Sequence, residues 1–427
     1  MEAPLDLAES VALVMSYPSR IKLAGAWCAI ALGFAIPVST AASNLLFALV
    51  IAFFVLSGDF RGKYRALAAN PAALAILLFC AAASLGCAYG AGSASEKMAS
   101  LGKYFTLLMA PLLIPLLAEP QHRIYALAAF CAAMLLTLVL SYLIYFGWFP
   151  PDLLIAVRER DPAAWGAHNP VVFKLHITHN FLMAFTVFLL AVAVRHLTSL
   201  RLRWLVLGLS ILAVGNVLLM VKGRTGYAVL ALLAAFFIAC RFGRKGLVAA
   251  AVAVLLLGTI AYQGSKAFQE RIDITIAQAG AWRPGQSGEQ NSISQRLDFY
   301  TNSIAIIRDH PLFGVGIGGF DAAYAERVRG TSMVFSSNPH NQYLMISAQL
   351  GLAGLLLLAL LYFTYWRQAA RLSEPFGQIA RGMLLAMLLG NLFNSFMIDF
   401  TERMFFAWIS GVLFAELSAR RVQPDPS

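Results

Sequence analysis

Charged residues are scarce in this chain of 427 residues. Asp, Glu, Lys and Arg make up 12% of it, whereas hydrophobic residues make up 60% and the mean hydropathy is +0.72. A soluble domain contains roughly 25% charged residues. The low charge excludes that class, and apolar runs of about 20 residues, long enough to cross a bilayer, recur along the chain. The composition predicts an all-α polytopic membrane protein, with residues 1–427 forming one integral domain.

Carboxylates are missing from the middle of the apolar runs before residue 263, and we find no inverted sequence repeat. A flippase or a proton-coupled transporter needs polar groups along the axis of its bundle. Their scarcity disfavours transport. The ionisable residues gather instead in loops, which favours chemistry at a membrane surface.

Metal and redox motifs are also lacking. His176 and His179 have i, i+3 spacing, but no Cys or carboxylate beside them completes a zinc ligand set. Glu159 and Asp161 form an isolated E-x-D; it could hold a divalent ion, but a solvated charge run is the simpler interpretation. We therefore predict no metal and no other cofactor. Five cysteines without metal or redox spacing are expected to be small buried side chains: Cys28, Cys80, Cys87, Cys131 and Cys240.

Twelve membrane spans are predicted, and the loops between them carry basic residues in alternation. The positive-inside rule then places these basic loops and both termini in the cytoplasm. The net charge of +11 is explained by topology, so we expect no nucleic-acid partner. Residues 1–21 show no cleavable signal, since they lack a basic n-region. The spans are 22–38, 41–57, 71–89, 104–118, 124–147, 177–194, 203–221, 225–240, 246–262, 342–366, 378–398 and 404–419.

Two outward loops are long, at residues 148–176 and 263–341. The second is too long to be a simple connector and should be structured. It holds seven basic and seven acidic residues, which suggests specific ion pairs with a few cations left for a ligand. Within it, an apolar stripe predicts an amphipathic helix from Ser292, closed by Pro311. The Gly-rich run 311–320 does not match a phosphate-binding loop and predicts a tight turn with close backbone approach.

Several polar residues lie at the predicted outer rim. Arg224 and Lys222 lie on a very short outward turn, against the positive-inside trend, and each can be a functional cation or a snorkelling anchor. Arg296 lies beside the apolar stripe. His340 can be a working residue at the mouth of a span or a satisfied interfacial histidine. Further candidates are Lys174, His179, Asn341 and Tyr343, while Asp399, Glu402 and Arg403 are expected to pair with one another.

The histidine carries a resemblance to a known family. His340 and Asn341, then nine residues, Gly351, two residues and Gly354 are similar to the H-[NSQ]-x9-G-x-x-G signature of bacterial O-antigen ligases. The run FGVGIGGF, upstream of His340, resembles the segment found there in the wider ligase and polymerase superfamily. The number of spans and the large late loop agree with the family's plan over nearly the whole chain.

The resemblance implies a GT-C-like enzyme of the bacterial inner membrane with a periplasmic active site. Its activity would be metal-independent, inverting transfer of O-antigen polysaccharide from undecaprenyl diphosphate to lipid A–core oligosaccharide. The family's catalytic histidine corresponds to His340, and its two arginines correspond to Arg224 and Arg296. An O-antigen polymerase or a protein O-oligosaccharyltransferase with the same donor is the alternative, and a lipid-linked glycan flippase is a more distant one. Membrane lipids are the remaining expected partner.

Overall fold

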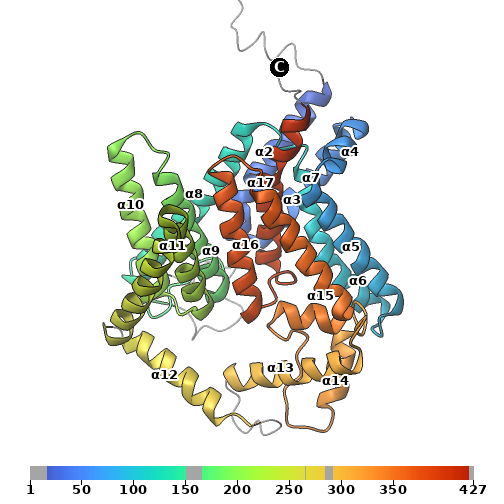
Figure 1. Cartoon of the computed structure of the whole chain (residues 1–427), viewed down its shortest axis with the longest axis vertical. Helices are drawn as coiled ribbons and strands as arrows, with labels where there is room; N and C mark the ends of the chain where they lie inside the picture. The colour runs from blue at the N-terminus through green and yellow to red at the C-terminus, as the bar shows by residue number, and fades with distance from the viewer. Residues whose placement is uncertain (1–16, 151–165, 265, 284–291, 423–427) are drawn as a thin grey trace, which may run out of the picture.

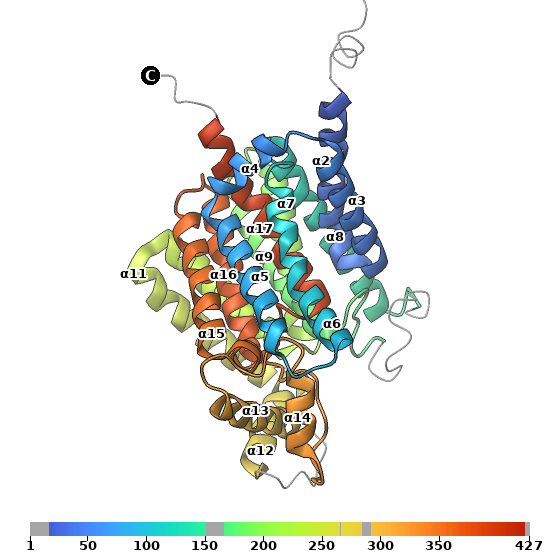
Figure 2. The same cartoon turned by 90° about the vertical axis from the view of Figure 1, so that its right-hand side faces the viewer.

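The computed structural model describes residues 17–150, 166–264, 266–283 and 292–422, and these are helical without any β-strand. A bundle of long helices forms the body. Helices α12, α13 and α14 form a layer across one end, and the chain's C-terminal side leaves from the other end (Figures 1 and 2). The all-α class predicted from composition is confirmed.

The elements follow in chain order and leave only short connections along most of the chain. They are α2 (Tyr17–Val38), α3 (Thr40–Leu56), α4 (Phe60–Ala68), α5 (Pro71–Tyr89), α6 (Ala94–Phe105), η1 (Thr106–Leu108), α7 (Met109–Leu113), α8 (Pro120–Tyr145), α9 (His176–Val194), α10 (Leu200–Gly215), η5 (Asn216–Met220), α11 (Arg224–Gly264), α12 (Lys266–Ala281), α13 (Ser292–Asp309), α14 (Phe320–Val328), α15 (Gln342–Ala369), α16 (Phe376–Phe393) and α17 (Phe400–Val422).

Eight helices of the described chain are long and apolar enough to cross a membrane. A ninth candidate is the pair α3 and α4, which are bent by 113° at their junction. The bend follows Gly58 and Asp59, both in left-handed backbone conformation. The multi-spanning character predicted from hydropathy is therefore confirmed, while the count of twelve stays a prediction.

The predicted spans that fall outside these eight have identifiable physical features. The predicted span 104–118 is broken into the end of α6, the 3-10 turn η1 and the short helix α7. The predicted span 246–262 lies in the second part of α11, beyond a break at Gly243. The predicted span 404–419 lies in α17, whose 23 residues include five charged ones. A segment that is short, broken or charged does not have the continuous apolar length expected of a membrane span.

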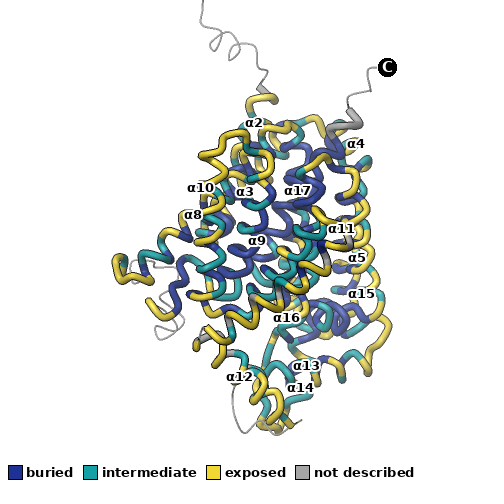
Figure 3. The backbone as a smooth tube through the Cα atoms, turned by 60° about the vertical axis from the view of Figure 1, so that its left-hand side comes forward, coloured by how far each residue is buried: buried dark blue, intermediate teal, exposed yellow. Residues whose placement is uncertain are grey.

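Helix α17 forms the centre of the core, as the burial colours of Figure 3 show. Trp408 is fully buried and donates its indole N–H to the carbonyl of Ala29, 2.9 Å away. Near its C-terminal end, Glu416 pairs with Arg123 at 3.1 Å, with both side chains 5% exposed. The buried charge of Glu416 is thus compensated inside the protein, which a buried ion requires.

The cysteines only partly match the expectation of burial. All five are free thiols, and Cys80 is buried, but Cys240 is exposed on α11. An apolar surface surrounded by lipid does not have to bury a small apolar side chain, so hydropathy alone cannot distinguish core from lipid-facing positions.

Helix α15 is broken at Gly351, which adopts φ 62° and ψ −154°. The break frees backbone groups that would be costly to leave unpaired within a membrane. The segment after Pro311 satisfies them: Leu352 donates to the carbonyl of Pro311 at 2.8 Å, and Val315 donates to the carbonyl of Ala348 at 2.8 Å. The predicted close backbone approach of the Gly-rich run is confirmed, and its partner is the interrupted helix.

Replacement of Gly351 by alanine should destabilise the fold. The backbone conformation of Gly351 is essentially restricted to glycine. Holding another residue in it would cost about 1–3 kcal/mol of folding free energy. A Cβ atom would also collide with the backbone of Leu312 and Phe313. Thermal unfolding in detergent should show a clearly lower Tm for G351A. Gly102 is the matched control, because a Cβ there has no neighbour within 4 Å; equal Tm values for G351A and G102A would contradict this account.

Candidate active site

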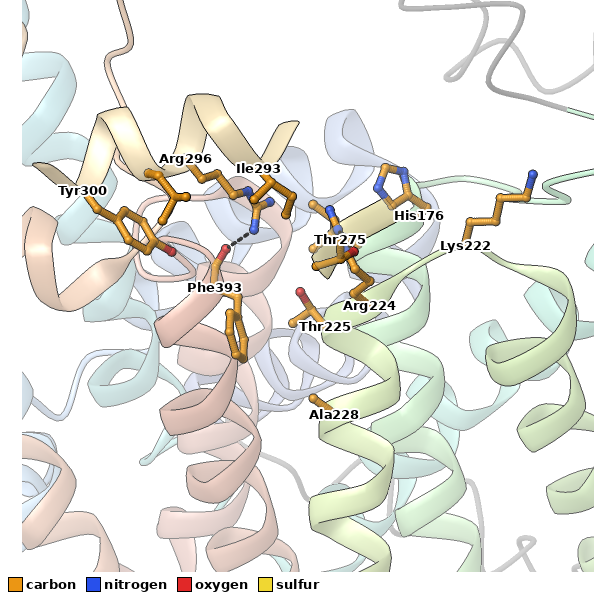
Figure 4. Close-up of a pocket in the computed structure, with 12 residues that line it drawn as sticks. His176, Lys222, Arg224, Thr225, Ala228, Thr275, Ile293, Arg296, Tyr300 and Phe393 are labelled. Atoms are coloured by element: carbon orange, nitrogen blue, oxygen red, sulfur yellow. Dashed lines mark hydrogen bonds between the residues drawn. The ribbon is translucent and has the colours of Figure 1, made fainter. Parts of the chain in front are cut away.

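A cavity of about 270 Å³ opens where the layer of α12 and α13 meets the ends of α9, α11 and α16. Figure 4 shows two arginines from different elements in this cavity: Arg224 from the start of α11 and Arg296 from α13. The lining consists of His176, Ile177, Lys222, Arg224, Thr225, Ala228, Thr275, Ile293, Arg296, Leu297, Tyr300 and Phe393. Three of these side chains are basic and none is a carboxylate, so the described lining favours an anionic ligand.

Arg224 is the first residue of α11, and its guanidinium Nη1 donates to the Thr275 hydroxyl of α12 at 2.6 Å. Two glycines allow this turn to pack closely: a Cβ at Gly223 or Gly226 would press against Asn180 of α9. The positive end of the α11 dipole lies at the same place. Arg224 is therefore held at the cavity by its helix and by a contact with the outer layer.

Arg296 lies on α13, the helix that the apolar stripe predicted, and the prediction of this helix is confirmed. Its Nη1 donates to the carbonyl of Phe393, the last residue of α16, at 3.0 Å. Burial lowers the pKa of Arg296 below its usual range, yet a guanidinium stays protonated in proteins. The interaction with a free helix-terminal carbonyl fixes a cation at the negative end of α16.

His340 is held in left-handed backbone conformation, with φ 54°. Its backbone N–H donates to the side-chain oxygen of Asn338 at 2.8 Å, and its ring lies 5.9 Å from that of Phe299 between centroids. Burial, followed by the charge of Arg296, lowers the pKa of His340 to about 4. Near pH 7 the imidazole is therefore neutral, which is the form that accepts a proton.

His340 is close to the cavity without lining it. The connection runs through Tyr300, which lines the cavity and whose hydroxyl lies 3.4 Å from the His340 carbonyl and 3.2 Å from that of Leu392. The effect of Arg296 on the His340 pKa also requires the two groups to be near one another. The structure thus brings Arg224 and Arg296 into one cavity, with His340 directly beside it.

Asn341 has a structural role that the sequence interpretation missed. It is the N-cap of α15: its side-chain oxygen accepts from the backbone N–H groups of Tyr343 and Leu344, at 3.0 and 3.1 Å. Its amide donates to the carbonyl of Leu392 at 3.0 Å. Asn is among the best N-cap residues, which agrees with its position at the start of this helix. The Tyr343 hydroxyl likewise binds α16, at the carbonyl of Leu388, 2.9 Å away.

The other candidates are divided between the cavity and the bundle. Lys222 lines the cavity, and so does His176, which sequence analysis had considered only as a metal ligand. His179, in contrast, is buried and bonded to Asn216 of η5 at 2.9 Å, outside the cavity. Lys174 donates to the Thr40 hydroxyl at 3.2 Å, and burial lowers its pKa to about 8.

A second group of charged residues lies at the start of α17, where Asp399 and Glu402 act electrostatically on Arg403, as expected of a mutually interacting group, but form no direct ion pair with it. Arg403 donates to the Ile398 carbonyl and to the Thr106 hydroxyl, and it forms no ion pair with either carboxylate. Asp399 accepts from the Asn338 amide at 3.3 Å, and burial raises its pKa. Asp399 therefore reaches the His340 backbone through Asn338.

The part of the chain that the structure describes contains no group of three or more His, Cys, Asp or Glu residues that could hold a metal ion. His176 lines the cavity, whereas His179 is bonded to Asn216. Glu159 and Asp161 lie outside the described residues.

Comparison with known proteins identifies the domain that contains this site. Residues 208–359 match the protein-family model described as O-Antigen ligase, and the matched segment includes Arg224, Arg296 and His340. No curated protein sequence matches the chain. The family indicated by the histidine motif is confirmed: over residues 208–359 the chain carries the domain of the O-antigen ligase family.

Proposed function

We propose that the protein is a membrane glycosyltransferase that moves O-antigen polysaccharide from undecaprenyl diphosphate to lipid A–core oligosaccharide. The observation that carries this proposal is the meeting of Arg224 and Arg296 in one cavity beside a neutral His340. The cavity is cationic and has apolar walls, which suits a diphosphate attached to a prenyl chain.

In this proposal the arginines bind the donor diphosphate. A guanidinium offers a planar fork of N–H donors that matches phosphate oxygens. Each fork is already held by a hydrogen bond, that of Arg224 to the hydroxyl of Thr275 and that of Arg296 to the carbonyl of Phe393. Negative charge grows on the diphosphate as the bond from sugar C1 to phosphate oxygen breaks. Fixed cations in a water-poor site stabilise that charge.

His340 then acts as the general base. A hydroxyl oxygen of the acceptor sugar attacks C1, its proton passes to the imidazole, and the diphosphate leaves with the bonding electron pair. No carboxylate lines the described cavity as a nucleophile. A single displacement with inversion at C1 follows, in a GT-C-like enzyme that needs no metal.

The membrane orientation is part of the proposal. The loops rich in Lys and Arg are assigned to the cytoplasm by the positive-inside rule. The cavity lies at the end opposite to them, which supports a periplasmic active site in the bacterial inner membrane, with both termini cytoplasmic. Residues 148–176 and 263–341 are then the two periplasmic loops.

An O-antigen polymerase or a protein O-oligosaccharyltransferase shares the donor and the proposed chemistry. The glycan that accumulates in a deletion strain distinguishes the ligase from the polymerase. Loss of a ligase leaves long polymer on the lipid carrier, whereas loss of a polymerase leaves single repeat units. Polymer transferred to protein would favour the third activity.

The pH dependence of transfer should report His340. The base works when neutral, so activity is present above its pKa of about 4 and is lost as the pH falls through that value. We expect kcat/KM for the donor to be flat between about pH 5 and 7. The H340A variant should lose about 10²–10⁴ in rate, while H310A, a change at an exposed histidine after α13, should not. A decline centred near pH 6.5, or near-normal transfer by H340A, would contradict the assignment.

Charge alone should not replace the two arginines. Lysine keeps the charge but loses the planar fork, so R224K and R296K should be substantially impaired, and the alanine variants should be worse. Binding of purified donor and turnover are measured for each variant in nanodiscs. R308K, on the exposed face of α13, is the matched control. Wild-type binding and turnover in both R224A and R296A would show that these cations are only interfacial anchors.

Transfer should proceed without divalent metal. The proposed diphosphate ligands are cationic side chains, which take the role that a divalent ion has in other lipid-linked glycosyltransferases. Reconstituted transfer with purified donor should therefore persist in excess EDTA. Activity that vanishes in EDTA and returns with Mg²⁺ or Mn²⁺ would assign the ion-binding role to Glu159 and Asp161.

A further inference from the structure

A second cavity lies at the opposite end of the bundle. It occupies about 460 Å³ between the C-terminal end of α15, the first turns of α16 and the part of α11 that precedes its break. Its described lining is Phe236, Trp366, Arg367, Ala370, Arg371 and Arg381. Arg367 of α15, Arg371 in the turn that follows and Arg381 of α16 thus surround one space, and none of the chemistry proposed above uses them.

The described lining of this cavity carries three positive charges. No carboxylate is among the lining residues. Arg371 donates to the side-chain oxygen of Gln368 at 3.2 Å. Arg367 and Arg381 form no hydrogen bond and no ion pair with any residue that the structure describes. Three cations around one space repel one another, and a bound anion would relieve that repulsion.

Another cavity near the same end provides a contrast. It occupies about 410 Å³ and is lined by two lysines, Lys22 and Lys63, and by two carboxylates, Asp59 and Glu119. Its formal charge is therefore balanced. Basic loops at this end do not by themselves produce a cavity with excess positive charge, so the three arginines need a separate explanation.

The surface leading to the cavity is apolar. Leu352, Leu356, Leu360 and Phe363 are exposed on α15, between 45% and 62%. With Arg367 they follow spacings of four, four, three and four residues, which places them along one face of the helix. A ligand with a phosphate headgroup and acyl chains would match both parts. The chains would lie along this face, and the headgroup would reach the arginines.

Trp366 supports the same position relative to the bilayer. Its side chain is 41% exposed and lies next to Arg367, at the end of the apolar face. Tryptophan is enriched at the boundary between hydrocarbon and headgroups. Basic pockets between transmembrane helices on the cytoplasmic side are known as sites for anionic headgroups.

We propose that the cavity lined by Arg367, Arg371 and Arg381 binds the phosphate headgroup of an anionic glycerophospholipid. The guanidinium groups donate to the phosphate oxygens, and the exposed face of α15 holds the acyl chains. The site is separate from the glycosyltransferase cavity and does not depend on the function proposed there.

The test uses the full chain purified in detergent and native mass spectrometry with phosphatidylglycerol or phosphatidylethanolamine of identical acyl chains. We expect wild-type protein to retain phosphatidylglycerol preferentially. The variant R367Q/R371Q/R381Q should lose affinity for it by on the order of 100-fold, because each Arg near an anionic lipid contributes a factor of about five. The variant R61Q/R65Q/R201Q removes the same charge from exposed positions at this end, and should bind like wild type.

Two further arms complete the experiment. The single variant R367Q, at an exposed position, should lose about fivefold in affinity even if the triple variant does not fold. Inorganic phosphate should not displace phosphatidylglycerol, because it cannot use the apolar face of α15. Equal binding of both lipids, wild-type affinity in R367Q, or displacement by phosphate would overturn the proposal. Glycan transfer by the variants is measured in parallel, so the lipid site and the proposed function succeed or fail separately.

Discussion

The break in α15 at Gly351 is the constraint on which the arrangement of the site depends. A helix interrupted inside a membrane protein needs partners for its freed backbone groups. The segment from Pro311 to Gly316 supplies them through hydrogen bonds to residues 348–353. This segment follows α13 directly, so the same contacts that repair α15 also fasten the outer helical layer to the bundle. Both ends of the site, Arg296 on α13 and His340 before α15, are fixed by that connection.

The end of α16 provides the second anchor. Its last carbonyls have no partner within their own helix, and they accept from Tyr300 and Asn341 at Leu392 and from Arg296 at Phe393. Side chains from two elements that are distant in sequence, α13 and the start of α15, therefore converge on one helix terminus. The negative end of that dipole also favours the cation of Arg296. A donor diphosphate would meet an arginine whose direction is already set, with little ordering left to occur on binding.

Local patterns predicted much of the fold and part of the site. The apolar stripe beginning at Ile293 predicted α13. A helix that packs on one side only has its apolar residues at helical spacing, and this pattern can be recognised in the sequence. The short turn before Arg224 indicated that this cation must remain at the surface of the bundle. Gly351 and Gly354 were recognised as a motif, but the break at Gly351 was not predicted, because its cause is a backbone segment about 40 residues upstream.

Other features could not be found from the sequence for physical reasons. Hydropathy predicted a continuous span at 104–118, where the structure has the end of α6, η1 and α7; here Pro111 and Pro115 were a sequence signal for a break that hydropathy does not register. His176 of α9 and Thr275 of α12 belong to one cavity only through the tertiary arrangement of two elements about 100 residues apart. The capping role of Asn341 was different, since an Asn directly before a long apolar run is a recognisable helix start. Its position next to a candidate catalytic histidine drew attention to chemistry instead.

The most direct measurement is a structure of the protein with undecaprenyl diphosphate bound in a lipid nanodisc. The account predicts phosphorus density between the guanidinium groups of Arg224 and Arg296, with the His340 imidazole on the side where the sugar C1 would lie. The account would be contradicted by diphosphate density elsewhere, with only solvent between Arg224 and Arg296. One such place is the space between Lys174 and Arg403, the latter at the start of α17.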